Sequence, residues 1–79
     1  MPLYYFDVID RGLLIRDQFG TDLADFEEAR EQAQCILPNM ARDELPFGEY
    51  INFVCEVRDE TGRVVYRGEL TYRGERDPV

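Results

Sequence analysis

The chain has 79 residues, 44% of them hydrophobic, which predicts one folded domain over residues 1–74 and a frayed C-terminal tail at 75–79. Its formal charge of −8, with no basic run, argues against nucleic acid and membrane surfaces as partners. Because serine, histidine, lysine and tryptophan are all missing, a Ser-His-Asp triad, a Cys-His dyad, a lysine Schiff base and a P-loop lysine are excluded within one subunit.

The first segment, residues 3–9 (LYYFDVI), is rich in β-branched and aromatic side chains and predicts a strand. Its core-facing side chains are expected to be Tyr4, Phe6 and Val8, and those on the opposite, still largely apolar face are Leu3, Tyr5, Asp7 and Ile9. Residues 10–12 (DRG) indicate a tight turn, and residues 13–16 (LLIR) predict a short return strand.

The stretch RDQFGTDLADFEEAR, residues 16–30, crowds carboxylates around one glycine. The calcium-loop spacing D-x-[DN]-x-[DN]-G is absent, so we expect no specific metal, although a weak divalent-cation site stays open as an alternative. Local structural roles fit better. Asp17 turns the chain through its side chain, Gly20 supplies a positive φ, and Asp25 caps a helix with Glu28 as its capping-box-like partner.

An amphipathic helix is predicted from Asp25 onward, because apolar residues recur at steps of three and four. The stripe comprises Phe26, Ala29, Ala33, Ile36, Leu37 and Met40. Pro38 removes one hydrogen bond and clashes with the preceding turn, so a stop or kink is expected near Leu37, with a further turn through Arg42 as an alternative. Cys35 lies opposite the stripe and is therefore predicted to be exposed.

After a connector at residues 45–50, residues 50–58 (YINFVCEVR) alternate as a strand should. The expected core face is Ile51, Phe53, Cys55 and Val57. Residues 59–62 predict a hairpin turn, and RVVYRGELTYR at 63–73 predicts the last strand, with a bulge or close backbone contact at Gly68. One face of that strand is expected to carry Val64, Tyr66, Leu70 and Tyr72.

The order strand, strand, helix, strand, strand predicts an α+β fold of ββαββ type. We expect a four-stranded antiparallel sheet in the order 2-1-3-4, with one helix packed on one face. The two cysteines are too few for a structural zinc site and are poorly placed for a disulfide, so free thiols in a bacterial cytoplasm are expected. Neither a signal peptide nor a membrane span is predicted.

Several short motifs resemble those of a family of small uncharacterised alphaproteobacterial proteins, catalogued as a domain of unknown function. They are Met1-Pro2-x-Tyr4-Tyr5-Phe6-x-Val8, Asp17-x-x-Gly20-x-x-Leu23, Ala29, Ala33 and Val57-x-Asp59-x-x-Gly62. The resemblance runs from residue 1 to about residue 70 and implies no activity, cofactor or catalytic residue. A weaker likeness is to HicB-type antitoxins, carried by Asp17, Gly20, Glu27, Glu28 and Ala29.

The apolar second face of the predicted sheet is the main functional clue, because an exposed apolar patch usually marks an interface. The candidate interface consists of Leu3, Tyr5, Ile9, Leu14, Tyr50, Val54 and Val65. We therefore expect a non-catalytic interaction or self-association module, forming a homodimer, without cofactor or metal. The alternative is an antitoxin-like protein that neutralises a basic partner. A third reading, a carboxylate-based metal-dependent enzyme, would require Asp17, Asp22 and Asp25 to converge on a pocket.

Overall fold

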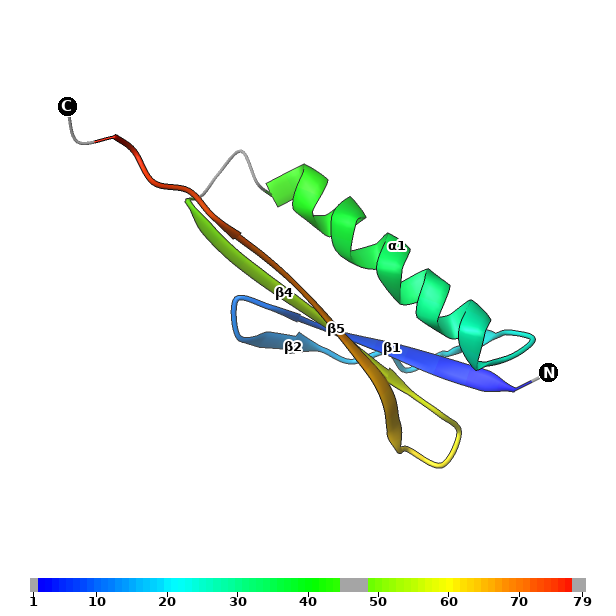
Figure 1. Cartoon of the computed structure of the whole chain (residues 1–79). Coiled ribbons are helices and arrows are strands. Elements are labelled where there is room, and N and C mark those ends of the chain that lie inside the picture. Colours follow the sequence, from blue (N-terminus) through cyan, green and yellow to red (C-terminus); the bar gives the residue numbers. More distant parts are fainter. Residues whose placement is uncertain (1, 45–48, 78–79) are drawn as a thin grey trace.

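The computed structural model describes residues 2–44 and 49–77 (Figure 1). In chain order its elements are β1 (Leu3–Asp10), β2 (Leu13–Ile15), β3 (Thr21–Asp22), α1 (Phe26–Glu44), β4 (Tyr50–Arg58) and β5 (Val64–Arg73). The helix lies along one face of the sheet, which confirms the predicted α+β class. Most of the connector before β4 and the last two residues of the predicted tail lie outside the described residues.

The sheet is antiparallel and has five strands, not the predicted four. Its path runs β2-β1-β4-β5, and β3 pairs with β1 off that path. In the predicted order 2-1-3-4, strands 3 and 4 correspond to β4 and β5 of the structure. That order therefore matches the path of the four longer strands and omits the short strand β3. Two residues give no periodicity to detect, and Thr21 pairs with Tyr4, a partner far back in the sequence.

The β1–β2 hairpin has a two-residue turn in which Arg11 (φ 53°) and Gly12 (φ 84°) both adopt positive φ. This is the type I′ geometry that matches strand twist. The β4–β5 hairpin is held by Asp59, whose Oδ1 accepts hydrogen bonds from the backbone N–H groups of Thr61 and Arg63. Both predicted turns are therefore confirmed.

Helix α1 begins as predicted, because Asp25 Oδ1 accepts from the N–H of Glu28 at 3.0 Å. Glu28 reaches back one residue further than expected and accepts from the N–H of Ala24. Of the alternatives at Pro38, the stop near Leu37 is wrong and the further turn through Arg42 is confirmed, because the helix continues through Pro38 to Glu44. Packing explains the continuation, since Leu37 and Ala41 on both sides of the proline are buried against the sheet.

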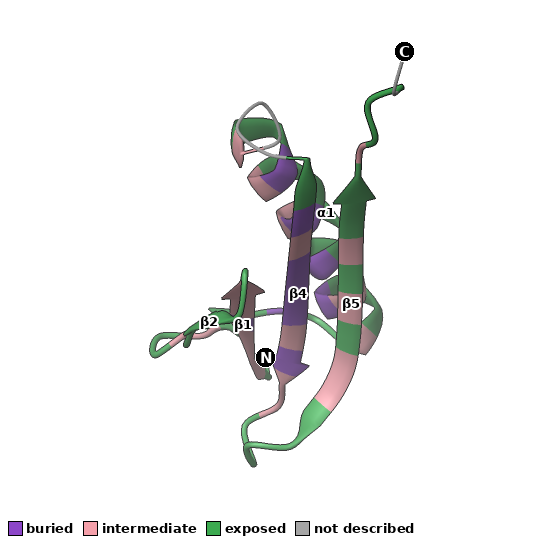
Figure 2. Ribbon diagram, turned by 90° about the vertical axis from the view of Figure 1, so that its left-hand side faces the viewer, coloured by how far each residue is buried: buried purple, intermediate pink, exposed green. Residues whose placement is uncertain are grey.

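The core lies between α1 and the covered face of the sheet, and Figure 2 shows buried residues concentrated on β4 and on one side of the helix. The helix contributes Ala29, Ala33, Leu37 and Ala41, and β4 contributes Ile51, Phe53, Cys55 and Val57. The helical set recurs every four residues and is mostly alanine, so the helix approaches the sheet closely. The predicted core faces of α1 and β4 are confirmed.

A bulge changes the faces at the start of β5, where the register shifts between Val57 and Arg58. Val65 therefore packs against the core, and Val64 is 47% exposed. Both assignments reverse the prediction, which assumed unbroken alternation. Gly68 is the site of close contact, because a Cβ there would lie 3.3 Å from Leu37 Cδ1. The bulge predicted as an alternative at Gly68 lies instead at the start of β5, near Val64 and Val65.

The molecule is elongated, with a Cα radius of gyration of 14.5 Å. A compact chain of this length would have a radius of about 12 Å. Its accessible surface is 5671 Å², against about 5000 Å² for a typical monomer of 9.3 kDa. Residues 74–77 belong to no helix or strand and continue away from the sheet, which accounts for part of the excess (Figure 1).

Candidate functional site

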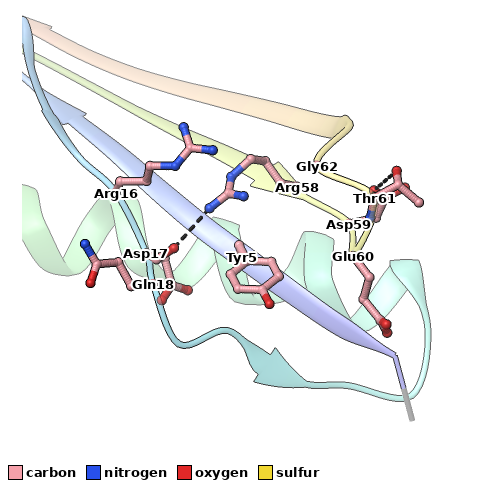
Figure 3. A pocket seen from close by; sticks show the side chains of 9 residues that line it. All are labelled: Tyr5, Arg16, Asp17, Gln18, Arg58, Asp59, Glu60, Thr61 and Gly62. Carbon is pink, nitrogen blue, oxygen red and sulfur yellow. Dashed lines mark hydrogen bonds between the residues drawn. The ribbon is translucent and has the colours of Figure 1, made fainter.

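The sheet has two candidate sites: a polar cluster on the face away from α1 and the outer edge of β5. The polar cluster consists of Tyr5, Asp7, Asp17 and Arg58 (Figure 3 draws all but Asp7). Asp7 is 2% exposed and accepts from Arg58 Nε at 2.5 Å and Nη2 at 3.1 Å. The guanidinium lies over the Tyr5 ring, 4.8 Å from its centroid.

Asp17 replaces a missing strand partner along β1. The β1 edge pairs with β3 at Leu3 and Tyr4 and with β2 from Val8 onward, which leaves a gap at Phe6. There the Phe6 N–H donates to Asp17 Oδ2 at 3.0 Å, while Oδ1 accepts from the N–H groups of Phe19 and Gly20. The turn predicted for Asp17 and the positive φ of Gly20 (74°) are confirmed.

The charge state of the cluster follows from these bonds. Burial by itself raises the pKa of Asp7, but hydrogen bonds from Arg58 and the Asp17 amide outweigh it, so the pKa lies below its ordinary value. Burial likewise raises the pKa of Asp17 when taken alone, but hydrogen bonds from three backbone N–H groups outweigh it, so this pKa also lies below its ordinary value. Both carboxylates are thus ionised at neutral pH and already hold donors. The cluster therefore has a structural role, because it holds Asp17 and the loop after β2 against the sheet.

A shallow hollow of about 430 Å³ adjoins this cluster. Its lining is polar and mixed in charge: Tyr5, Arg16, Asp17, Gln18, Arg58, Asp59, Glu60, Thr61 and Gly62 (Figure 3). Arg58 donates to Asp7 and to the Asp17 carbonyl, and Asp59 accepts from Thr61 and Arg63. Arg58 and Asp59 thus already bond to groups of the protein itself, so they do not form an acid–base pair that is free to act on a molecule in the hollow.

The acidic loop does not gather its carboxylates. Asp17 lies against β1, Asp22 belongs to β3 and Asp25 caps α1, and the hollow beside Asp17 is lined by neither of the other two. Within residues 2–44 and 49–77, no group of three or more histidine, cysteine, aspartate or glutamate side chains is arranged to hold a metal ion. The convergence required by the enzyme hypothesis is absent from the described part of the chain.

The predicted interface residues do not form one exposed patch. Leu14 (51% exposed) and Tyr50 (61%) are open, while Leu3, Tyr5 and Ile9 are half-buried. Val54 is buried, and Val65 packs on the helix side, which corrects its predicted face. The remaining large exposed apolar side chains near β2 are Leu13, Ile15 and Phe19.

Sequence reasoning placed Asp7 on the largely apolar second face of the sheet and did not identify Arg58 as its partner. The available signal was an acid within the apolar segment LYYFDVI, since a carboxylate inside a strand needs a partner. The partner lies 51 residues away in sequence, on the neighbouring strand, so only the sheet register identifies it.

The outer edge of β5 is the second feature. No described strand pairs with it, whereas its inner edge pairs with β4 throughout (Figure 2). The Gly74 N–H donates to the Glu49 carbonyl, and the register places these two residues opposite each other. Because backbone direction alternates along a strand, the backbone groups of Arg67, Glu69 and Thr71 point outward.

A groove of about 210 Å³ runs beside this edge, between α1 and β5. Its lining is Gln34, Leu37, Pro38, Tyr66, Gly68, Glu69 and Leu70. Tyr66 and Leu70 are only half-buried by the core they pack against. The edge thus combines unpaired backbone groups with apolar side chains on the helix side.

The two thiols differ as predicted. Cys35 is free and exposed on α1, and Cys55 is free and buried in β4. Burial, with Asp7 and Glu56 nearby, raises the pKa of the Cys55 thiol to about 11. Cys55 is therefore an inert core residue at neutral pH.

Comparison with known proteins yields one match. A family model described as "Domain of unknown function (DUF6894)" matches residues 3–71, which is most of the chain. The comparisons with curated proteins and with solved structures gave no match. The expected resemblance to a domain of unknown function is confirmed, while the alphaproteobacterial distribution, the start motif and the HicB likeness stay predictions. Among the described residues, no helix is both long and apolar enough to cross a membrane.

Proposed function

The chain belongs to the DUF6894 family, and from that premise we propose that it is a non-catalytic protein-interaction module that adds a partner's strand to the outer edge of β5. The module works in the cytoplasm, where the free thiols of Cys35 and Cys55 are stable.

The observation that carries this proposal is the length of the open edge. Strand β5 runs for 10 residues with one side unpaired by any strand that the structure describes, whereas the opposite edge strand, β2, has only 3. Proteins usually protect such edges with short strands, prolines, charged side chains or a covering element. Residues 66–73 of β5 contain no proline, their charges are of both signs (Arg67 and Arg73 with Glu69) and can therefore pair across an added strand, and the register shift near Val64 leaves them regular.

A non-catalytic role is supported by the hydrogen bonds and ion pairs that the carboxylates already make within the chain. The carboxylates of Asp7, Asp17 and Asp25 hold an arginine or backbone N–H groups. No specific observation favours the third possibility, a carboxylate enzyme.

The test uses a backbone change on the open edge. Thr71→Pro removes an outward N–H without touching the β4 ladder, and edge strands tolerate proline. Thr71→Ala is the matched control, because both variants lose the hydrogen bond from Asn52 Nδ2 to the Thr71 hydroxyl. Tagged wild type and Thr71→Ala should capture the same protein, either an untagged copy or another chain, and Thr71→Pro should lose it. Equal capture by Thr71→Pro would refute the proposal.

The antitoxin-like alternative retains one observation in its favour. The exposed face of α1 carries Glu27, Glu28 and Glu31, which suits a basic partner. A partner bound there would be released by salt and by replacing these glutamates with glutamine, and it would be insensitive to Thr71→Pro.

A further inference from the structure

We infer that the strand received by the β5 edge is β5 of a second copy of this chain, antiparallel about a two-fold axis at Gly68. This inference rests on the proposed function and names its partner. The two sheets would join into one, with both helices on the same face.

The register follows from backbone direction and charge. Outward-pointing residues of one strand must oppose outward-pointing residues of the other, so Arg67 and Glu69 must each face an outward-pointing residue of the second copy. A two-fold axis at Gly68 puts Arg67 of each chain opposite Glu69 of the other, giving two attractive pairs. The neighbouring registers put Glu69 opposite Glu69 or Arg67 opposite Arg67, which are repulsive.

On the face of the sheet that α1 covers, the side chains of the two copies are also complementary in this register. Tyr66 of one chain lies opposite Leu70 of the other, beside the groove formed with Leu37 and Pro38. At the axis Gly68 opposes Gly68, so the strands meet without side chains directly beneath α1, where Leu37 already lies close. An apolar pair on each side of the axis thus adds to the charged pairs on the other face.

Net charge favours this edge over the rest of the surface. Residues 1–49 hold eleven acids and four arginines, a net charge of −7, and residues 50–79 hold the remaining six acids and five bases, a net charge of −1. Two copies therefore meet with least repulsion through the C-terminal strands.

Sedimentation velocity from micromolar to millimolar protein tests the register with two charge reversals. Wild type should dimerise, and Arg67→Glu and Glu69→Arg should each raise the dimer dissociation constant about tenfold or more, because each creates two like-charge contacts. An equimolar mixture of the two variants should recover a dimer of wild-type affinity. In that heterodimer both cross-strand pairs are again opposite in charge. Among the described residues, Arg67 makes ion pairs at 3.6 Å with the partly exposed Glu56 and the exposed Glu69 of its own chain, so the folded state survives its replacement.

Leu14→Glu, on the opposite edge of the sheet, is the control and should leave the dissociation constant unchanged. A strictly monomeric wild type, or a dimer indifferent to both charge reversals, overturns the inference. A dimer lost with Leu14→Glu overturns it too and moves self-association to β2. If Thr71→Pro breaks a dimer that ignores the charge reversals, or releases a different captured protein, the proposed edge function survives and only the Gly68 register fails.

A cross-link provides a second readout. Opposed hydrogen-bonded residues have Cα atoms about 5.5 Å apart, within disulfide range. In a Cys35→Ala background, mixing Arg67→Cys with Glu69→Cys should yield an oxidised heterodimer. Arg67→Cys alone should cross-link poorly, because its two thiols are two residues out of register, and efficient cross-linking of that single variant would contradict the Gly68 axis.

Discussion

The carboxylate of Asp7 on β1 and the guanidinium of Arg58 at the end of β4 form a two-point ion pair, with Nε–Oδ2 at 2.5 Å and Nη2–Oδ1 at 3.1 Å. Arg58 also donates to the Asp17 carbonyl, and the Asp17 N–H donates to Asp7. One charged pair therefore holds the loop after β2 onto the face of the sheet opposite α1.

Replacing Asp7 by asparagine should lower the free energy of unfolding by about 3 kcal/mol, because it leaves the largely buried Arg58 without its counter-charge. Urea denaturation measures the loss. Glu56→Gln is the control on the same face, where a partly exposed pair with Arg67 at 3.6 Å should cost less than about 0.5 kcal/mol. Equal losses for the two variants would contradict the assignment.

The Asp7 and Asp17 carboxyls predict an acid-sensitive fold. Their pKa values lie below that of an unfolded aspartate, about 3.9, so the unfolded chain takes up protons first. Their stabilisation is fully present above about pH 5 and is lost as pH falls through about 4 toward the folded values. Asp10 acts with the opposite sign, because burial and Glu44 raise its pKa. Urea unfolding from neutral to acid pH should therefore show a shallower acid loss for Asp7→Asn than for wild type. Parallel curves would exclude this contribution of Asp7.

Gly20 should tolerate a side chain less well than Gly12, although both have positive φ. A Cβ on Gly20 would lie 3.0 Å from Tyr5 Cε1, whereas one on Gly12 meets nothing within 4 Å. Thermal or urea unfolding should give a loss of about 1 kcal/mol for Gly12→Ala and about 2 to 3 kcal/mol for Gly20→Ala. The difference reports the contact with Tyr5, and similar losses would mean that the ring moves freely.

The bulge in β5 predicts opposite outcomes for two adjacent valines. Val65→Asp should cost about 2 to 3 kcal/mol, because it puts an unpaired carboxylate against the core. Val64→Asp should change stability by less than about 0.5 kcal/mol, since Val64 is 47% exposed. Denaturant unfolding of both variants measures these values, and the reverse ranking would restore the unbroken alternation expected from sequence.

The two cysteines should differ in their reaction with a thiol reagent. Under native conditions a thiol reagent should modify Cys35 only, since Cys55 is buried and its pKa is raised to about 11. Both should react in denaturant. Mass spectrometry of the modified peptides identifies the site, and rapid native modification of Cys55 would show that the core between α1 and β4 opens readily.

Much of the fold is legible in the sequence because its determinants are local. Alternation in residues 50–58 identified the buried face of β4, and three- and four-residue steps identified the buried face of α1. Asp17, Gly20 and Asp25 were correctly assigned to turns and a cap, since those roles depend on neighbouring backbone groups. The candidate interface was less predictable, because burial of Val54 and coverage of Tyr5 depend on other strands and on the loop after β2.

The sequence by itself determined which longer segments form strands and which forms the helix, which faces of α1 and β4 are buried, and which catalytic chemistries are impossible without serine, histidine and lysine. Only the tertiary structure decided the passage of α1 through Pro38, the pairing of β3, the bulge opposite Val57 and the Asp7–Arg58 tie. Each of these depends on contacts between residues distant in the chain, whose packing and hydrogen-bond energies outweigh local preference. The open edge of β5 belongs with them, because an edge exists only once the order of strands is set.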